Sequence, residues 1–93
     1  MLLTIKYQNN ETTLYVALDL FTIRQLKRII CNYKDINIIT HDIMLIYNNK
    51  ILDNNLTNIH YDITNGSVID AYISIRTPME VAMMKMIHES QKY

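Results

Sequence analysis

The side chains best suited to catalysis or metal binding are few and widely spaced in this sequence. Cys31 is the only cysteine, so neither an intrachain disulfide nor a thiol-rich metal site can form. The histidines His41, His60 and His88 lack the i, i+4 spacing and the neighbouring cysteines that a zinc site needs. No paired carboxylates, no nucleophile beside a base and no Gly-rich phosphate loop stand at readable spacing. The sequence therefore predicts no enzymatic activity, no metal and no cofactor.

Positive and negative charges balance along the chain, which has a formal net charge of zero. Such a balance provides no global basic field to attract nucleic acid or an anionic membrane. One predicted helix has a basic outer face, which we interpret first as a solvated surface; its residues are Arg24, Lys27, Arg28 and Lys34. The lone cysteine, with no signal-peptide pattern and no long apolar run, predicts an intracellular protein, cytoplasmic or nuclear, with no nucleic-acid or membrane partner.

The residues from Phe21 to Lys34 have the pattern of a capped amphipathic helix. Thr22 and Gln25 stand at the spacing of a capping box. Apolar side chains then recur at steps of three and four, which predicts one stripe to be buried: Ile23, Leu26, Ile30 and Tyr33. Cys31, beside this stripe, is expected to be a small buried hydrophobe rather than a nucleophile.

Alternating apolar and polar residues on both sides of this helix predict strands. The expected strands are Met1 to Tyr7, Thr12 to Leu18, Ile43 to Tyr47, Lys50 to Leu52 and Ser67 to Ile75. In the second strand we favour Leu14, Val16 and Leu18 as the set that faces the core. A loop with a short helical turn is expected between Asp53 and Gly66.

A second capping box opens the C-terminal segment, with Thr77 as cap, Pro78 at the first helical position and Glu80 at the third. The helix predicted from Pro78 to about Gln91 has one apolar face, formed by Met79, Ala82, Met83, Met86 and Ile87. Methionine is flexible and polarizable, which suits adaptable docking surfaces. This helix either packs on its own domain, binds an external partner, or pairs with a second copy in a homodimer.

The order strand, strand, helix, strand, short strand, long strand over residues 1–76 resembles the β-grasp fold of ubiquitin and its relatives. The segment from Leu45 to Lys50 resembles ubiquitin's Leu-Ile-Phe-Ala-Gly-Lys hairpin, and the segment from Ser67 to Tyr72 is similar to the Asp-Val-Ile-Glu-Val-Tyr of SUMO. The resemblance implies an α+β fold with a mixed sheet of four to five strands packed on one helix, and an additional C-terminal helix. It divides the chain into a ubiquitin-like β-grasp domain, residues 1–76, and a C-terminal amphipathic Met-rich helix, residues 77–93.

The C-terminal segment departs from the pattern of the conjugated members of this family. Those members end in an exposed tail that closes with Gly-Gly, whereas here a predicted helix follows Arg76, and Gly66 is the only glycine. The resemblance therefore implies a non-conjugated ubiquitin-like or SUMO-like module that binds proteins of unknown identity. Small size and codon-biased composition suggest a viral mimic that engages host ubiquitin-pathway proteins. The alternative is a structural subunit of a larger assembly, resembling elongin B, and a processed conjugatable modifier is disfavoured.

The resemblance also implies a binding face. Ile46 falls where ubiquitin has the central isoleucine of its recognition patch, Tyr72 falls where it has a valine, and Met44 is expected on the same outer face. Gln8 replaces the leucine that completes the patch. The expected protein-binding residues are Met44, Ile46, Tyr72, Met79, Met83, Met86 and Ile87. Two alternatives stay open: the C-terminal helix folds back over the sheet residues, or an extended peptide adds to the edge strand at Thr12 to Leu18.

Overall fold

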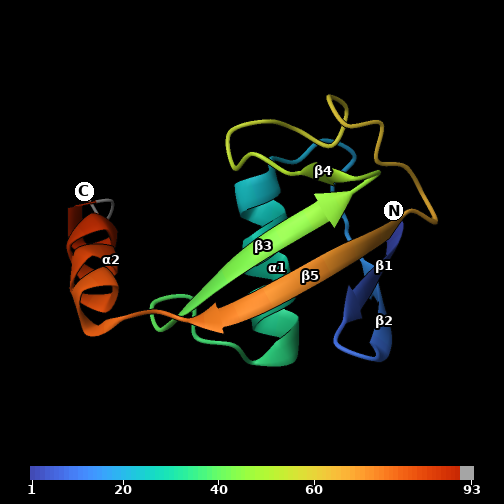
Figure 1. Cartoon of the computed structure of the whole chain (residues 1–93). Coiled ribbons are helices and arrows are strands. Elements are labelled where there is room, and N and C mark those ends of the chain that lie inside the picture. The colour runs from blue at the N-terminus through green and yellow to red at the C-terminus, as the bar shows by residue number, and fades with distance from the viewer. Residues whose placement is uncertain (91–93) are drawn as a thin grey trace.

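The structure is a computed structural model that describes the backbone of residues 1–90 and the side chains of residues 1–87. Five strands and two helices follow one another as β1 (Leu2–Tyr7), β2 (Asn10–Tyr15), α1 (Ile23–Lys34), β3 (His41–Tyr47), β4 (Lys50–Ile51), β5 (Val68–Ile75) and α2 (Pro78–Ser90). The strands form one sheet in the order β2-β1-β5-β3-β4 (Figure 1). β1 and β5 are parallel, while the other neighbours are antiparallel. The predicted mixed sheet with one packed helix and an additional C-terminal helix is confirmed.

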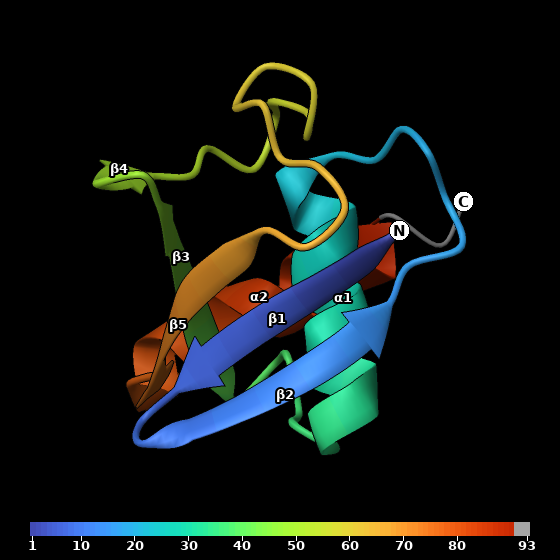
Figure 2. The same ribbon diagram turned by 90° about the vertical axis from the view of Figure 1, so that its right-hand side faces the viewer.

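The protein has two layers, because α1 lies across one face of the sheet and leaves the other face open (Figures 1 and 2). Alternation along the strands sends every second side chain toward α1. Together these side chains and the buried stripe of α1 form a single core. Its members are Leu3, Ile5, Leu14, Val16, Phe21, Ile23, Leu26, Ile30, Cys31, Ile43, Leu45, Leu52, Ile63, Ile69 and Ala71.

The capping box of α1 forms as expected. The Gln25 backbone N–H donates to Thr22 Oγ1 over 3.2 Å, and the Thr22 N–H donates to Gln25 Oε1 over 2.9 Å. Phe21, directly before the cap, is buried in the core. The helix therefore begins where local side-chain chemistry predicts.

Two members of the predicted core are exposed instead. Tyr33 is 61% exposed, because the buried arc of α1 is centred between Ile30 and Cys31 and leaves Tyr33 at its margin. Leu18 is exposed because β2 ends at Tyr15, so the alternation that would bury it no longer applies. The burial of Leu14, Val16 and Cys31 is confirmed.

The region between β4 and β5 consists of turns, and a buried polar side chain ties it to the start of α1. Asn58 is 2% exposed. Its Oδ1 accepts from the Phe21 backbone N–H over 2.9 Å, and its Nδ2 donates to the Asp19 carbonyl over 3.1 Å. The Asn58 backbone N–H also donates to the Phe21 carbonyl over 3.0 Å. These three bonds hold the long loop against the helix entrance, and sequence patterning did not single out Asn58.

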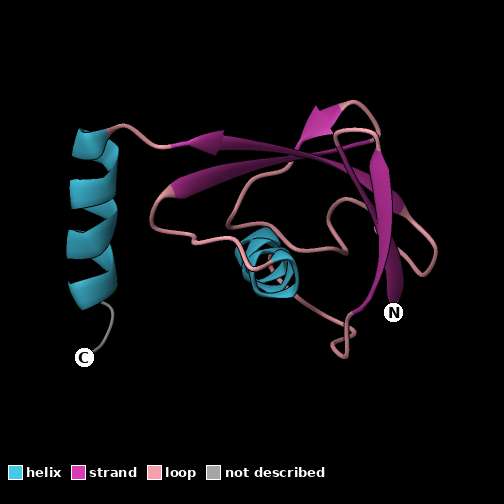
Figure 3. Ribbon diagram, turned by 90° about the horizontal axis from the view of Figure 1, so that it is seen from below, coloured by secondary structure: helices cyan, strands magenta, loops and turns pink. Residues whose placement is uncertain are grey.

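The second helix stands beyond the ends of β3 and β5, beside the two-layer body rather than on the open face of the sheet (Figures 1 and 3). Its predicted capping box is present. The Thr77 N–H donates to Glu80 Oε1 over 3.1 Å, and the Glu80 N–H donates to Thr77 Oγ1 over 3.2 Å. The start of α2 is therefore fixed locally, without help from the core.

Acid is expected to loosen this start, because the hydrogen bonds with Thr77 hold the pKa of the Glu80 carboxyl below its usual value. A carboxyl whose pKa falls on folding stabilises the folded form above its unfolded pKa of about 4.3, and this contribution is lost as the pH falls through the lowered value. Carbon chemical shifts of residues 78–82 should lose helical character as the pH falls through the lowered pKa of Glu80. Glu80→Gln keeps an acceptor at this position and should abolish that dependence; an unchanged dependence in the variant would contradict the assignment.

Candidate functional site

The open face of the sheet carries an apolar patch on three neighbouring strands. Met44 on β3 lies directly opposite Tyr72 on β5, and the two side chains are 38% and 56% exposed. Ile46 lies two residues further along β3, where it is half-buried and faces Ile51 of β4. We refer to Met44, Ile46, Ile51 and Tyr72 as the outer-face patch. The structure thus brings together the three sheet residues expected from the sequence.

Sequence reasoning missed the fourth member, Ile51, which is 66% exposed. The hairpin turn between β3 and β4 could have indicated the position of Ile51. Asn48 and Asn49 both have positive φ, at 53° and 62°, as a two-residue hairpin turn requires. A two-residue turn pairs the residues on either side of it and then Ile46 with Ile51, which places both side chains on one face.

Polar residues border the outer-face patch on the side of β1. Lys6 pairs with Asp70 in register and forms an ion pair with Glu11, with Nζ and Oε1 3.7 Å apart. A depression of about 320 Å³ between these strands is lined by Lys6, Gln8 and Tyr72 among others. Gln8, with φ 55°, therefore lies next to the patch and contributes a polar edge. Asp70 of β5 lies directly opposite Ile46, so polar side chains border the outer-face patch on β5 as well as on β1.

The methionines of α2 form a separate surface. Met79, Met83 and Met86 are all exposed, and Ile87 is 46% exposed, whereas the half-buried positions of the helix are Val81 and Met84. The helix therefore turns Val81 and Met84 toward the body. The structure does not bring the methionine face together with the outer-face patch, and α2 does not fold back over it (Figure 1).

The edge position expected for the second strand is confirmed, since β2 is the outermost strand on its side of the sheet. Leu14 points into the core, and Tyr15 is exposed on the open face. The outer backbone groups of β2 have no neighbouring strand among the described residues. An added strand has room at this edge.

The residues considered for chemistry stay apart in space. Cys31 is buried and free, and burial raises the pKa of its thiol, an effect that Arg76 and Lys27 oppose. Residues 1–90 contain no group of three His, Cys, Asp or Glu side chains that could hold a metal ion, as far as their side chains are described. The side chain of His88 lies outside the described residues. Within the same part of the chain, no helix is both long and apolar enough to cross a membrane.

A mixed five-stranded sheet packed on one helix defines the class of β-grasp domains. The family model described as the Ubiquitin family matches residues 3–76. The chain belongs to the ubiquitin family. This match and the strand order confirm the ubiquitin-like β-grasp fold.

Solved structures show the same fold at low sequence identity. The N-terminal ubiquitin-like domain in the 4931431F19Rik protein, a solution structure, superposes with a TM-score of 0.71 at 19% identity, covering 83% of this chain and 77% of that one. The crystal structure of ATBAG1 in complex with HSP70 gives a TM-score of 0.68 at 16% identity, covering 99% of this chain and 48% of that one. No curated protein sequence matches the chain.

Proposed function

We propose that this protein is a non-conjugated ubiquitin-like interaction module that binds a protein partner through the outer-face patch. The observation that carries the proposal is the exposure of neighbouring large apolar side chains, Met44, Ile51 and Tyr72, on the open face of the sheet. Exposed contiguous apolar surface with a polar border is typical of protein-binding sites. The similarity in fold to ATBAG1, solved in complex with HSP70, is consistent with a protein partner. No catalytic role is assigned.

The segment after β5 supports the non-conjugated part of this proposal. Conjugation requires an extended tail there, whereas a capped helix begins at Pro78, three residues after β5 ends at Ile75. We assign residues 1–76 to the interaction domain and residues 77–93 to an appended helix whose exposed Met79, Met83, Met86 and Ile87 provide a second contact surface. An intracellular location and a role as a viral mimic of host ubiquitin-pathway proteins stay predictions from composition.

Replacing Tyr72 with alanine is expected to weaken partner binding about 10- to 100-fold, because a half-exposed tyrosine in an apolar patch contributes on the order of 1–3 kcal/mol to an interface. Ile46→Ala should weaken it in the same direction. The partner is identified by affinity capture with the full chain, and the dissociation constants are then measured by calorimetry with purified proteins.

Tyr15→Ala is the matched control, since Tyr15 is an exposed tyrosine on the same open face but lies on β2, away from the patch. It should leave the affinity unchanged. Equal losses of affinity from Tyr15→Ala and Tyr72→Ala would mean that the partner does not bind at the outer-face patch.

The exposed methionines of α2 favour a second function, that of a constitutive subunit in a larger assembly, as the likeness to elongin B implied. Size-exclusion chromatography with light scattering separates the two functions. A stable complex of fixed stoichiometry that depends on Met79 and Met83 would favour the subunit, while reversible capture that depends on Tyr72 favours the interaction module. A homodimer through α2 would appear in the same measurement as a doubled mass.

A further inference from the structure

A cavity of about 300 Å³ opens between α1, the start of β3 and α2. Its polar lining is mostly cationic, with Arg24, Lys27 and Arg28 from α1 and Arg76 from the connection between β5 and α2. Asp42 is the carboxylate among the described lining residues. The proposed interaction through the sheet makes no use of this cavity.

Helix spacing and the anchoring of Arg76 together bring the four cationic side chains to one cavity. Arg24, Lys27 and Arg28 stand at i, i+3 and i+4, so they share one side of α1. Arg76 comes from the connection between β5 and α2, far from α1 in the sequence, and its side chain is only 14% exposed. Its backbone N–H donates to the Thr40 carbonyl over 2.8 Å, and its Nε donates to the His41 carbonyl over 3.1 Å. Arg76 is thus held in place at the cavity wall.

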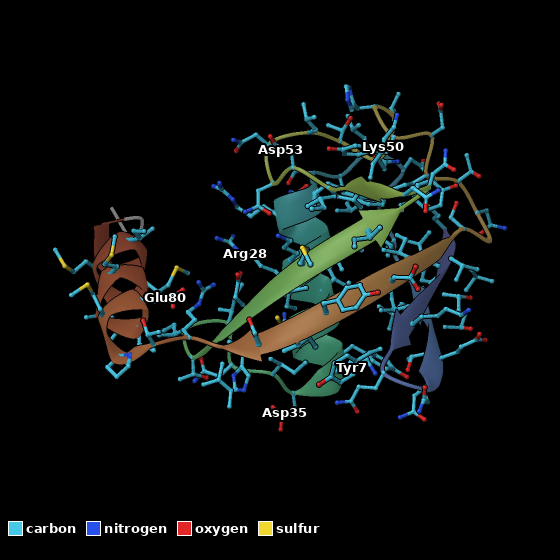
Figure 4. The ribbon with its side chains drawn as sticks, in the orientation of Figure 1. Tyr7, Arg28, Asp35, Lys50, Asp53 and Glu80 are labelled. Carbon is cyan, nitrogen blue, oxygen red and sulfur yellow. The ribbon has the colours of Figure 1, made fainter. Side chains whose placement is uncertain are left out.

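The positive charge in the cavity is only partly neutralised. Arg76 Nη2 and Asp42 Oδ1 are 3.5 Å apart, and Arg24 donates to the neutral Asn55 Oδ1 over 3.3 Å. Among the described residues, Lys27 and Arg28 form no ion pair within 4.0 Å. Figure 4 shows Arg28 extending from α1 toward the side on which α2 stands. Two cations therefore remain available to a ligand.

The lowered pKa of Lys27 is consistent with this excess of positive charge in the cavity. Burial lowers the pKa of its ammonium, and Arg76 and Arg24 act in the same direction, while Asp42 and Asp53 oppose them. A half-buried cation beside other cations is less stable than it would be in water. An anion bound in the cavity would relieve this repulsion.

We propose that this cavity binds a small phosphate-bearing anion that has an apolar end. Guanidinium groups match the geometry of phosphate oxygens and bind them through paired hydrogen bonds. The apolar end would rest on Ile43 and on Met84 and Ile87 of α2, which line the same space. The volume suits a small molecule, since it falls at the lower end of the range for such sites. In this proposal α2 also forms one wall of the anion-binding cavity, through Met84 and Ile87.

The test titrates the full chain, labelled with nitrogen-15, with inorganic tripolyphosphate and with ATP, and follows the amide resonances and the heat of binding. Saturable shifts are expected at Arg24 to Arg28 and at Arg76 for both probes. ATP should bind more tightly, because its adenine ring adds apolar contact that tripolyphosphate lacks. Absence of saturable shifts at these residues would overturn the proposal, and equal affinities would overturn the assignment of an apolar end.

Arg28→Gln should weaken ATP binding about tenfold, because one charge-assisted contact of about 1.4 kcal/mol corresponds to a factor of ten. The double variant Arg24→Gln with Arg28→Gln should weaken it further. Both side chains are exposed, so these variants are expected to fold. Lys50→Gln is the matched control, because it removes one exposed positive charge on β4, outside the cavity. Equal weakening by Lys50→Gln and Arg28→Gln would show nonspecific attraction and overturn the site.

The two binding proposals fail separately. Tyr72→Ala should leave ATP binding unchanged, and Arg28→Gln should leave binding of the protein partner unchanged. Binding of an acidic peptide at Arg24 and Arg28 without any response to ATP would replace the small anion by a protein segment and would overturn the proposal as stated.

Discussion

Replacing Ile30 with alanine is expected to lower the free energy of unfolding by about 2–5 kcal/mol. Ile30 is fully buried at the centre of the stripe by which α1 packs on the sheet. The loss combines the missing apolar contacts with the cavity left behind, which the close-packed core fills only in part. Since domains of this size are stable by about 5–15 kcal/mol in total, the variant should be close to the limit of folding.

The matched control is Tyr33→Ala, three residues further along the same helix. Sequence periodicity places Tyr33 in the buried stripe, but the structure leaves most of it exposed. Its replacement should change stability by about 0.5 kcal/mol or less. Urea unfolding followed by circular dichroism suits both variants, because the chain contains no tryptophan. A loss at Tyr33 as large as that at Ile30 would mean that α1 is rotated from the orientation described.

Replacing Asn58 with alanine is expected to lower the free energy of unfolding by about 2–3 kcal/mol, the second largest effect. The substitution would leave the buried Phe21 N–H without its acceptor and the Asp19 carbonyl without its donor. A buried polar group that loses its partner contributes its full desolvation penalty, which water cannot relieve inside the core. The loop between β4 and β5 should also exchange its amide hydrogens faster.

Asn54→Ala is the control for this prediction, since Asn54 is an exposed asparagine in the same loop. This variant should change the urea midpoint of unfolding little. The slope of the unfolding free energy against urea concentration should stay unchanged. If Asn58→Ala matched this control in both stability and amide exchange, the buried hydrogen bonds would not be what ties the loop to α1.

Much of the fold was predictable because its signals are local. Thr22 with Gln25 and Thr77 with Glu80 fix two helix starts within four residues each. Strand alternation likewise predicted β5, since the expected strand from Ser67 to Ile75 agrees with the observed Val68–Ile75. Such signals depend on neighbours in the chain, so one sequence is enough to read them.

The candidate site was predictable in part. Met44, Ile46 and Tyr72 lie together on the open face, as the resemblance to ubiquitin implied. The place of Ile51 in the patch could not be predicted in this way, because it depends on the register of β4. That strand has only two residues, too few for a periodic pattern. The role of Asn58 was equally hidden, because nothing in its own segment indicates a partner 37 residues earlier in the chain.

The position of α2 was decided only by the tertiary structure. Its amphipathic pattern left three placements open, and a helical period alone cannot choose among them. The chain turns at Arg76, which is anchored to Thr40 and His41, and this anchor directs α2 past the end of the sheet. The outer-face patch therefore stays open, and Arg76 joins the basic side of α1 around a cavity. Local sequence was enough for the order of the elements and for the helix caps, whereas the two candidate binding sites depend on contacts between residues far apart in the chain.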